Sequence, residues 1–108
     1  MPRDWRIRLS DIREAAERAL SYVKDIEFDD FKLDQLRQDA VVRCLEVIGE
    51  AARHTPPEVR TQFPDVPWDD LVGMRNLLAH EYFGVDLKIL WVTATEDLPE
   101  LLGALKRN

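Results

Sequence analysis

Cysteine is almost missing from this chain of 108 residues, and long apolar runs are missing altogether. Cys44 is the single cysteine, which excludes an intrachain disulfide and any zinc site built from several cysteines. No apolar stretch approaches the roughly 20 residues that a membrane-spanning helix needs, and the first residues contain no hydrophobic signal core. We therefore expect a cytoplasmic protein without a membrane segment, in which Cys44 is a small core residue.

Positive charge is also in short supply. Lys and Arg number 15 against 21 Asp and Glu, which gives a formal net charge of −6 at pH 7. Proteins that bind nucleic acid without regard to sequence are usually basic, because they displace counterions from the phosphates. The acidic balance therefore argues against loose binding along nucleic acid. It leaves open a small site with local positive charge, or a basic protein partner.

Glycine and proline are few, and the segments between them show helical periodicity. Apolar residues recur at three- and four-residue steps, and no alternating strand pattern occurs. We expect one all-α domain over residues 1–108, an antiparallel bundle of four to five helices. The last predicted helix is either a separate short helix or a kinked continuation of the fourth. The first predicted helix runs from residue 10 or 11 to about 24, and the second covers 34–53. The third runs from 67 to between 81 and 83, the fourth covers 86–94, and the last starts at 97–99 and extends to about 105.

Three residues near the end of the second predicted helix require an interpretation. Gly49 lies inside the helix, where glycine costs about 1 kcal/mol relative to alanine, so we expect a neighbouring helix to approach closely there. Glu50 either pairs with Arg75 or is an ordinary surface carboxylate. His54, just before two prolines, is most simply a surface residue that favours the helix dipole when charged.

The third predicted helix has an unusual outer face. On a helical wheel, one side holds the apolar residues that we assign to the core, Leu71, Met74, Leu77 and Leu78. Arg75, Asn76 and His80 fall on roughly the opposite side. Small and apolar residues surround this polar trio, unlike the Lys and Glu of a solvated face. We therefore expect the same helix of a second copy to pack here, with a dimer interface formed by Val72, Ala79 and Phe83.

The polar trio has a defined chemistry. His80 can accept and donate protons near neutral pH, Arg75 can bind phosphate through its planar fork, and Asn76 can orient either group. A His and an Arg without metal ligands suit cleavage of RNA by its own 2′-hydroxyl. On spacing alone, a dimer contact made by polar side chains stays open as the alternative. One His without further ligands is insufficient for zinc, so we expect no metal and no cofactor.

The segment from Arg75 to Tyr82 matches the pattern Arg, four residues, His, any residue, Tyr. With this pattern on its third helix, the chain resembles the HepT-like toxins of the HEPN ribonuclease superfamily. The match extends from about Trp5 to Leu105, through the segments 39–51, 66–76, 82–86 and 98–101. An Arg-x4-His pattern alone would be weak evidence, and the extended match is strong.

The resemblance implies an all-helical dimer in which the motifs of two protomers meet at the interface. It also implies a metal-independent endoribonuclease that is the toxin of a toxin–antitoxin pair. Carried over residue by residue, Arg75 and His80 would be catalytic and Asn76 supporting. Tyr82 would be the residue to which a nucleotidyltransferase antitoxin of the MNT type attaches AMP. The alternative hypothesis is a non-catalytic dimeric helical module that binds a nucleotidyltransferase partner or a nucleotide.

Overall fold

The structure is a computed structural model that describes residues 4–81 and 86–107, with the backbone only for residues 79–81. Every regular element within these residues is helical, and this confirms the all-α prediction. The elements are α1 (Trp5–Val23), α2 (Phe28–Lys32), α3 (Gln35–Arg53), α4 (Pro57–Arg60), α5 (Trp68–Glu81), α6 (Leu87–Val92), the π-helical turn η2 (Thr93–Asp97) and α7 (Leu98–Lys106).

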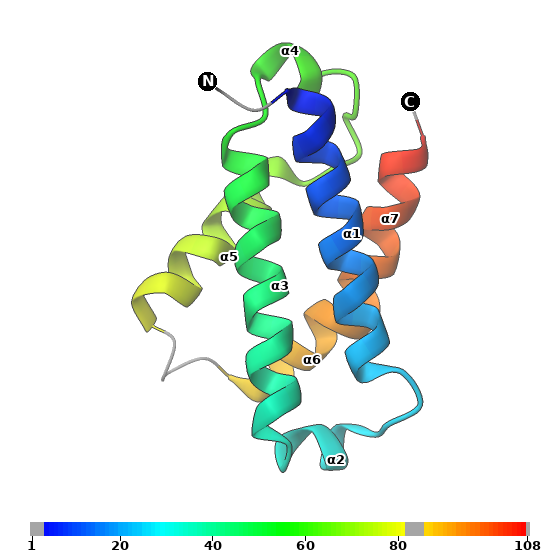
Figure 1. Cartoon of the computed structure of the whole chain (residues 1–108), viewed down its shortest axis with the longest axis vertical. Helices are drawn as coiled ribbons and strands as arrows, with labels where there is room; N and C mark the ends of the chain where they lie inside the picture. The colour runs from blue at the N-terminus through cyan, green and yellow to red at the C-terminus, as the bar shows by residue number, and fades with distance from the viewer. Residues whose placement is uncertain (1–3, 82–85, 108) are drawn as a thin grey trace.

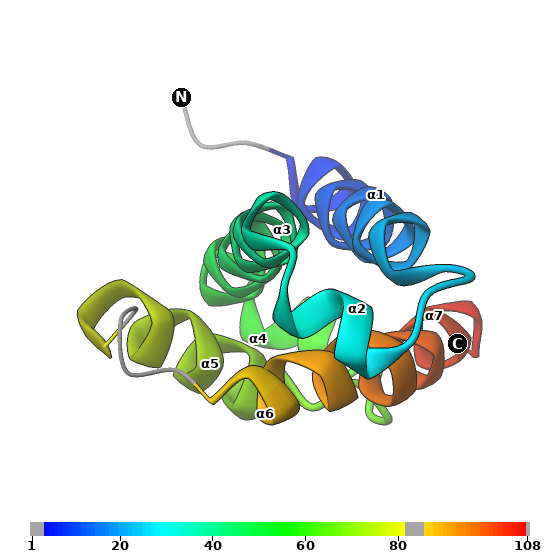
Figure 2. The same cartoon turned by 90° about the horizontal axis from the view of Figure 1, so that it is seen from below.

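The bundle is formed by α1, α3, α5 and the C-terminal stretch of α6, η2 and α7 (Figure 1). α1 and α3 run antiparallel along the long axis, and α7 packs along α1. Seen from below, the short α2 bridges α3 and α6 at one end (Figure 2). α5 lies obliquely at the margin of the bundle and packs mainly against α3.

The core lies between α1, α3 and α7. The small side chains of Ala15, Ala16 and Ala19 on α1 are fully buried, which lets α3 approach closely. Cys44 on α3 is buried as expected, and burial raises the pKa of its thiol. α3 supplies the broadest buried apolar face, made of Val41, Val42, Cys44, Leu45, Ile48, Ala51 and Ala52.

α1 begins earlier than the sequence predicted. The side chain of Asp4 accepts a hydrogen bond of 2.8 Å from a backbone N–H in the first turn and caps the helix at Trp5, whereas we expected a start at residue 10 or 11. Two capping signals compete here, and Trp5 packs against the core, which keeps the additional turn helical. α3 and α6 begin where expected, after their caps Asp34 and Asp86.

The C-terminal stretch is continuous from α6 to α7. The last helix is therefore a continuation of the fourth predicted helix and not a separate short helix. Pro99 lies in the first turn of α7. It has no N–H to donate to residue 95, and its ring crowds that carbonyl, which explains why α-helical hydrogen bonding is interrupted just before it. The hydroxyls of Thr93 and Thr95 each donate 2.8 Å hydrogen bonds to carbonyls four residues earlier.

Arg60 joins the end of α3 to the start of α5. Its Nη2 donates to the carbonyl of Ala52 (2.9 Å) and its Nε to the carbonyl of Thr55 (3.1 Å), at and just after the end of α3. Its guanidinium lies 5.7 Å from the centre of the Trp68 ring in the first turn of α5. The indole N–H of Trp68 in turn donates to the carbonyl of Phe63 (3.1 Å). These contacts determine where α5 begins against α3.

Candidate functional site

α3 and α5 approach each other closely at Gly49. A β-carbon built on Gly49 would lie 2.7 Å from the carbonyl oxygen of Leu71 and closer still to Cβ of Arg75. Real β-carbons essentially never come within 3.0 Å of such atoms, so only glycine fits here. The predicted close approach is confirmed, and it seats Arg75 on the flank of α3.

The helical wheel predicted that Arg75 faces away from its own protomer. In the structure, Arg75 instead faces α3 of the same protomer. Its Nε lies 3.4 Å from Oε2 of Glu50 on α3, and its Nη1 donates to Oδ1 of the adjacent Asn76 (3.3 Å). The Arg75 side chain remains 32 % exposed. Leu77, which we assigned to the core, is 43 % exposed. The prediction was wrong because α5 is only weakly amphipathic, so its pattern does not define the side that meets α3.

Glu50 is the carboxylate at the centre of this cluster, and its ion pair with Arg75 confirms one of the two interpretations of the sequence. Its other oxygen, Oε1, lies 2.9 Å from Nε2 of His54 and 3.4 Å from Nη1 of Arg53. The hydrogen bond with His54, and the positive charges of Arg53 and Arg75, hold the pKa of Glu50 below its usual range although burial acts against them. Glu50 is therefore a carboxylate at neutral pH.

His54 takes part in this cluster, although the sequence indicated only a surface position. It is the C-cap residue of α3, and its side chain is partly exposed as expected. The signal for its partner was present in the sequence, since Glu50 and His54 are four residues apart and therefore neighbours on a helix surface. The structure adds that Glu50, the partner of His54, also faces Arg75 on α5.

The remaining predicted site residues lie along α5 and just after it. Asn76 is exposed beside Arg75, and Val72 is half-buried and packs in part against the protomer's own core. The structure thus brings together Arg75, Asn76 and Glu50, and places the backbone of residue 80 in the last turn of α5. Outside the described part of the chain are the side chains of Ala79 and His80 and the whole of Tyr82 and Phe83.

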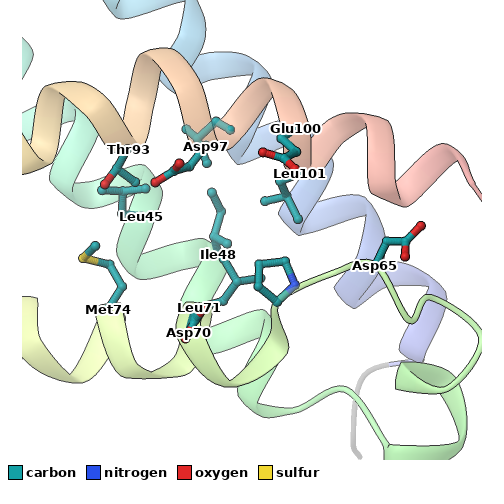
Figure 3. Close-up of a pocket in the computed structure, with 12 residues that line it drawn as sticks. Leu45, Ile48, Asp65, Asp70, Leu71, Met74, Thr93, Asp97, Glu100 and Leu101 are labelled. Carbon is teal, nitrogen blue, oxygen red and sulfur yellow. The ribbon is translucent and has the colours of Figure 1, made fainter.

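A cavity of about 370 Å³ lies between α3, α5 and the C-terminal stretch (Figure 3). Arg75 does not line it. Burial and the charges of Glu96 and Glu100 raise the pKa of Asp97 at its edge. Because carboxylates repel phosphate, the Arg75 cluster and not this cavity is the candidate site for an anion. The cavity combines apolar walls, among them Ile48, Leu71 and Leu101, with the carboxylates of Asp65, Asp70, Asp97 and Glu100.

The described parts of residues 4–81 and 86–107 hold neither a membrane span nor a metal cluster. No helix in these ranges has the length and the apolar character to span a membrane. Among the side chains that the structure describes, which leaves out those of residues 79–81, no group of three His, Cys, Asp or Glu is arranged to hold a metal ion.

The contacts that Arg75 makes with described residues leave one edge of its guanidinium for a phosphate. An arginine carries five N–H groups in one plane, of which Glu50 faces the Nε group and Asn76 takes one on Nη1. These two contacts do not use Nη2, and about a third of the side chain is exposed. The arrangement can therefore bind and orient a phosphate through the end of the guanidinium.

The fold and the pattern on α5 define a HEPN-like helical bundle. The chain belongs to the HepT-like ribonuclease family, whose model matches residues 12–107. It is 41 % identical over 107 residues to a protein of Thermococcus cleftensis that is named provisionally as ribonuclease HepT, over 99 % of this chain and 97 % of that one.

Two further relatives are named provisionally as RNases. One, from Methanocaldococcus jannaschii, is 42 % identical over 99 residues, which are 92 % of this chain and 91 % of that one. The other, from Caldanaerobacter subterraneus, is 44 % identical over 98 residues, which are 91 % of this chain and 88 % of that one. No solved structure gives a significant match.

Proposed function

We propose that the protein is a metal-independent endoribonuclease that acts as the toxin of a toxin–antitoxin pair, with a composite site at a homodimer interface. The placement of Arg75 carries the proposal. Gly49 seats it on α3, Glu50 and Asn76 hold its guanidinium, and part of the side chain stays open to solvent. The family and the names of the relatives support RNA as the substrate.

In this proposal the Arg75 and His80 residues of two protomers share one cleft. His80 of one protomer accepts the proton of the RNA 2′-hydroxyl, whose oxygen forms a bond to the adjacent phosphorus. The bond from phosphorus to the 5′-oxygen of the next nucleotide breaks, and the other histidine donates the proton that this oxygen takes up. Arg75 stabilises the negative charge that builds up on the phosphoryl oxygens. The products are a 2′,3′-cyclic phosphate and a 5′-hydroxyl.

The dimer in this proposal forms across α5. Among the described helices, α5 packs mainly against α3, and it lies at the margin of the bundle in Figure 1 and Figure 2. Leu77 is exposed on it, and Val72 is only half-buried by the protomer itself. A second α5 would cover this partly apolar surface and bring the two motifs together. The interface would include Val72, Ala79 and Phe83.

Control of the toxin is assigned to Tyr82 in this proposal. A nucleotidyltransferase antitoxin of the MNT type attaches AMP there: the Tyr82 oxygen forms a bond to the α-phosphorus of ATP, and pyrophosphate leaves. Tyr82 follows the last residue of α5, so the attached AMP adds bulk and negative charge at the end of the helix that carries Arg75. The AMP phosphate would compete with RNA for the guanidinium.

A second candidate function is a non-catalytic dimeric module that docks a nucleotidyltransferase or binds a nucleotide. The net charge of −6 favours it, because RNA-binding proteins are more often basic. In this version Arg75 binds a phosphate and His80 moves no proton. The two functions differ in whether RNA is cut.

Growth arrest on expression, and cleavage of RNA by the purified protein, test the enzyme. Arg75→Ala and His80→Ala should each lower cleavage at least about 100-fold and abolish growth arrest, and wild-type cleavage should persist in EDTA. Arg13→Ala is the matched control, because it removes an exposed arginine whose only ion pair with a described residue is with Glu17 on α1, and it should keep both activities. Full activity of His80→Ala would contradict the proposed site, and no RNA cleavage by the wild type would favour the binding module.

Tyr82→Phe tests the control step, because it removes only the hydroxyl. The variant should remain toxic when the nucleotidyltransferase is co-expressed, whereas the wild type should be neutralised. Mass spectrometry of the wild-type protein from the same cells should find AMP on the peptide that contains Tyr82. AMP on another residue, or on none, would contradict the assignment.

A further inference from the structure

Glu50 lies between the two helices of the site. Its Oε1 faces His54 (2.9 Å) and Arg53 (3.4 Å) on its own helix, whereas its Oε2 faces Nε of Arg75 (3.4 Å) on α5. Oε2 is buried and has no hydrogen-bond partner within the described residues. The charge of Arg75 is therefore what compensates this oxygen for the loss of water.

We propose that Glu50 and His54 are positioning residues for Arg75: Glu50 holds the guanidinium by its Nε side, and His54 holds Glu50. The inference rests on the ribonuclease function proposed above, in which Arg75 binds the reacting phosphate. Neither Glu50 nor His54 touches the RNA in this arrangement. Both act through the guanidinium.

The need for such a hold follows from the flexibility of arginine. A free arginine side chain populates many rotamers, and its rotation would carry the charge away from the phosphate. Contacts at Nε and Nη1 restrict that rotation and leave the Nη2 end for the substrate. The contact with His54 is the shortest of those that Glu50 makes, and it occupies Oε1, which leaves Oε2 to face α5.

Steady-state cleavage of a short RNA that carries a fluorophore and a quencher tests this inference. Glu50→Gln keeps the size of the side chain and removes its charge, and should lower kcat by about 10- to 100-fold, because a misplacement of about 1 Å has effects of this size. KM should change by less than about twofold, since RNA does not contact Glu50. Glu46→Gln is the matched control, since Glu46 lies one turn earlier on α3 and forms no ion pair with a described residue, and it should keep the wild-type kcat.

Variants of His54 provide a second test, which does not depend on the stability of the Glu50 variants. Its side chain is 42 % exposed, so His54→Ala should fold normally and lower kcat severalfold. His54→Gln keeps an N–H group that can reach Glu50, and should restore kcat to near the wild-type value. Rates are counted per folded protein, measured by circular dichroism.

The outcomes separate this inference from the function on which it rests. If Arg75→Ala cuts RNA at the wild-type rate, the proposed function is wrong and the inference fails with it. If Arg75→Ala is inactive but Glu50→Gln and His54→Ala keep the wild-type kcat, only the positioning role is overturned. A loss in His54→Gln as deep as that in His54→Ala also overturns it, because the imidazole would then act by itself.

Discussion

The Gly49→Ala variant tests how the site is held together. The added methyl group would lie 2.7 Å from the Leu71 carbonyl oxygen, whereas ordinary contact begins at 3.4 Å, and it would lie closer still to Cβ of Arg75. Neither atom can be moved away by a change of rotamer. α5 must therefore retreat from α3, by about 0.7 Å at Leu71 to restore ordinary contact and by more at Arg75.

Two opposing effects determine the stability of this variant. Alanine in a helix interior is more favourable than glycine by about 1 kcal/mol, whereas overpacking of a close helix contact costs about 1–3 kcal/mol. The expected net loss is up to about 2 kcal/mol in the free energy of unfolding. For a domain of this size, each kcal/mol lost lowers Tm by about 4–8 °C. Thermal unfolding followed by circular dichroism measures it.

The activity of Gly49→Ala should fall further than its stability. Arg75 is itself one of the displaced residues, and a misplacement of about 1 Å costs about 100-fold in rate. RNA cleavage at a temperature where the variant is folded should therefore drop by about 10- to 100-fold. The helical content should remain that of the wild type, because only the spacing of two helices changes.

Two other glycines provide the controls for this substitution. A β-carbon on Gly73 would have no atom within 4 Å, and one on Gly103 would meet only the flexible end of Arg107, at 3.3 Å. Gly73→Ala and Gly103→Ala should each gain up to about 1 kcal/mol from helix propensity, and Gly103→Ala should keep full cleavage. If Gly49→Ala were as stable and as active as Gly103→Ala, the reasoning from the helix crossing would be refuted.

Two further predictions concern the predicted dimer face and the charged edge of the cavity. Ala79→Glu puts a charge on the predicted dimer face and should give a monomer by light scattering, and a stable dimer would count against that interface. The pKa of Asp97 is raised in the folded protein. The ionised carboxylate therefore opposes folding at a pH above the folded-state pKa, and this effect is absent at a pH below the unfolded-state pKa of about 3.9. Asp97→Asn should therefore raise Tm at pH 7 and leave it unchanged at pH 3; an equal rise at both pH values would contradict the cause.

Helix positions were predictable wherever one local signal stood alone. Asp34 and Asp86 each precede a clear apolar periodicity, and both cap helices where expected. The start of α1 was predicted wrongly because Asp4 and the residues at 10 and 11 are all good caps, and the packing of Trp5 decides between them. The interruption before Pro99 was predictable as a kink, and its π-helical form was not.

The sequence by itself determined the long helices apart from the start of α1, the burial of Cys44, the close approach at Gly49 and the Arg-x4-His spacing of Arg75 and His80. These follow from neighbours in the chain, through propensity, capping and periodicity. Only the tertiary structure decided which side of α5 meets α3, and so placed Arg75 against Glu50 and brought in His54. A helical wheel gives only the angles between side chains around the axis of one helix. The partner of each face depends on the packing of residues far apart in sequence, summed over the whole core.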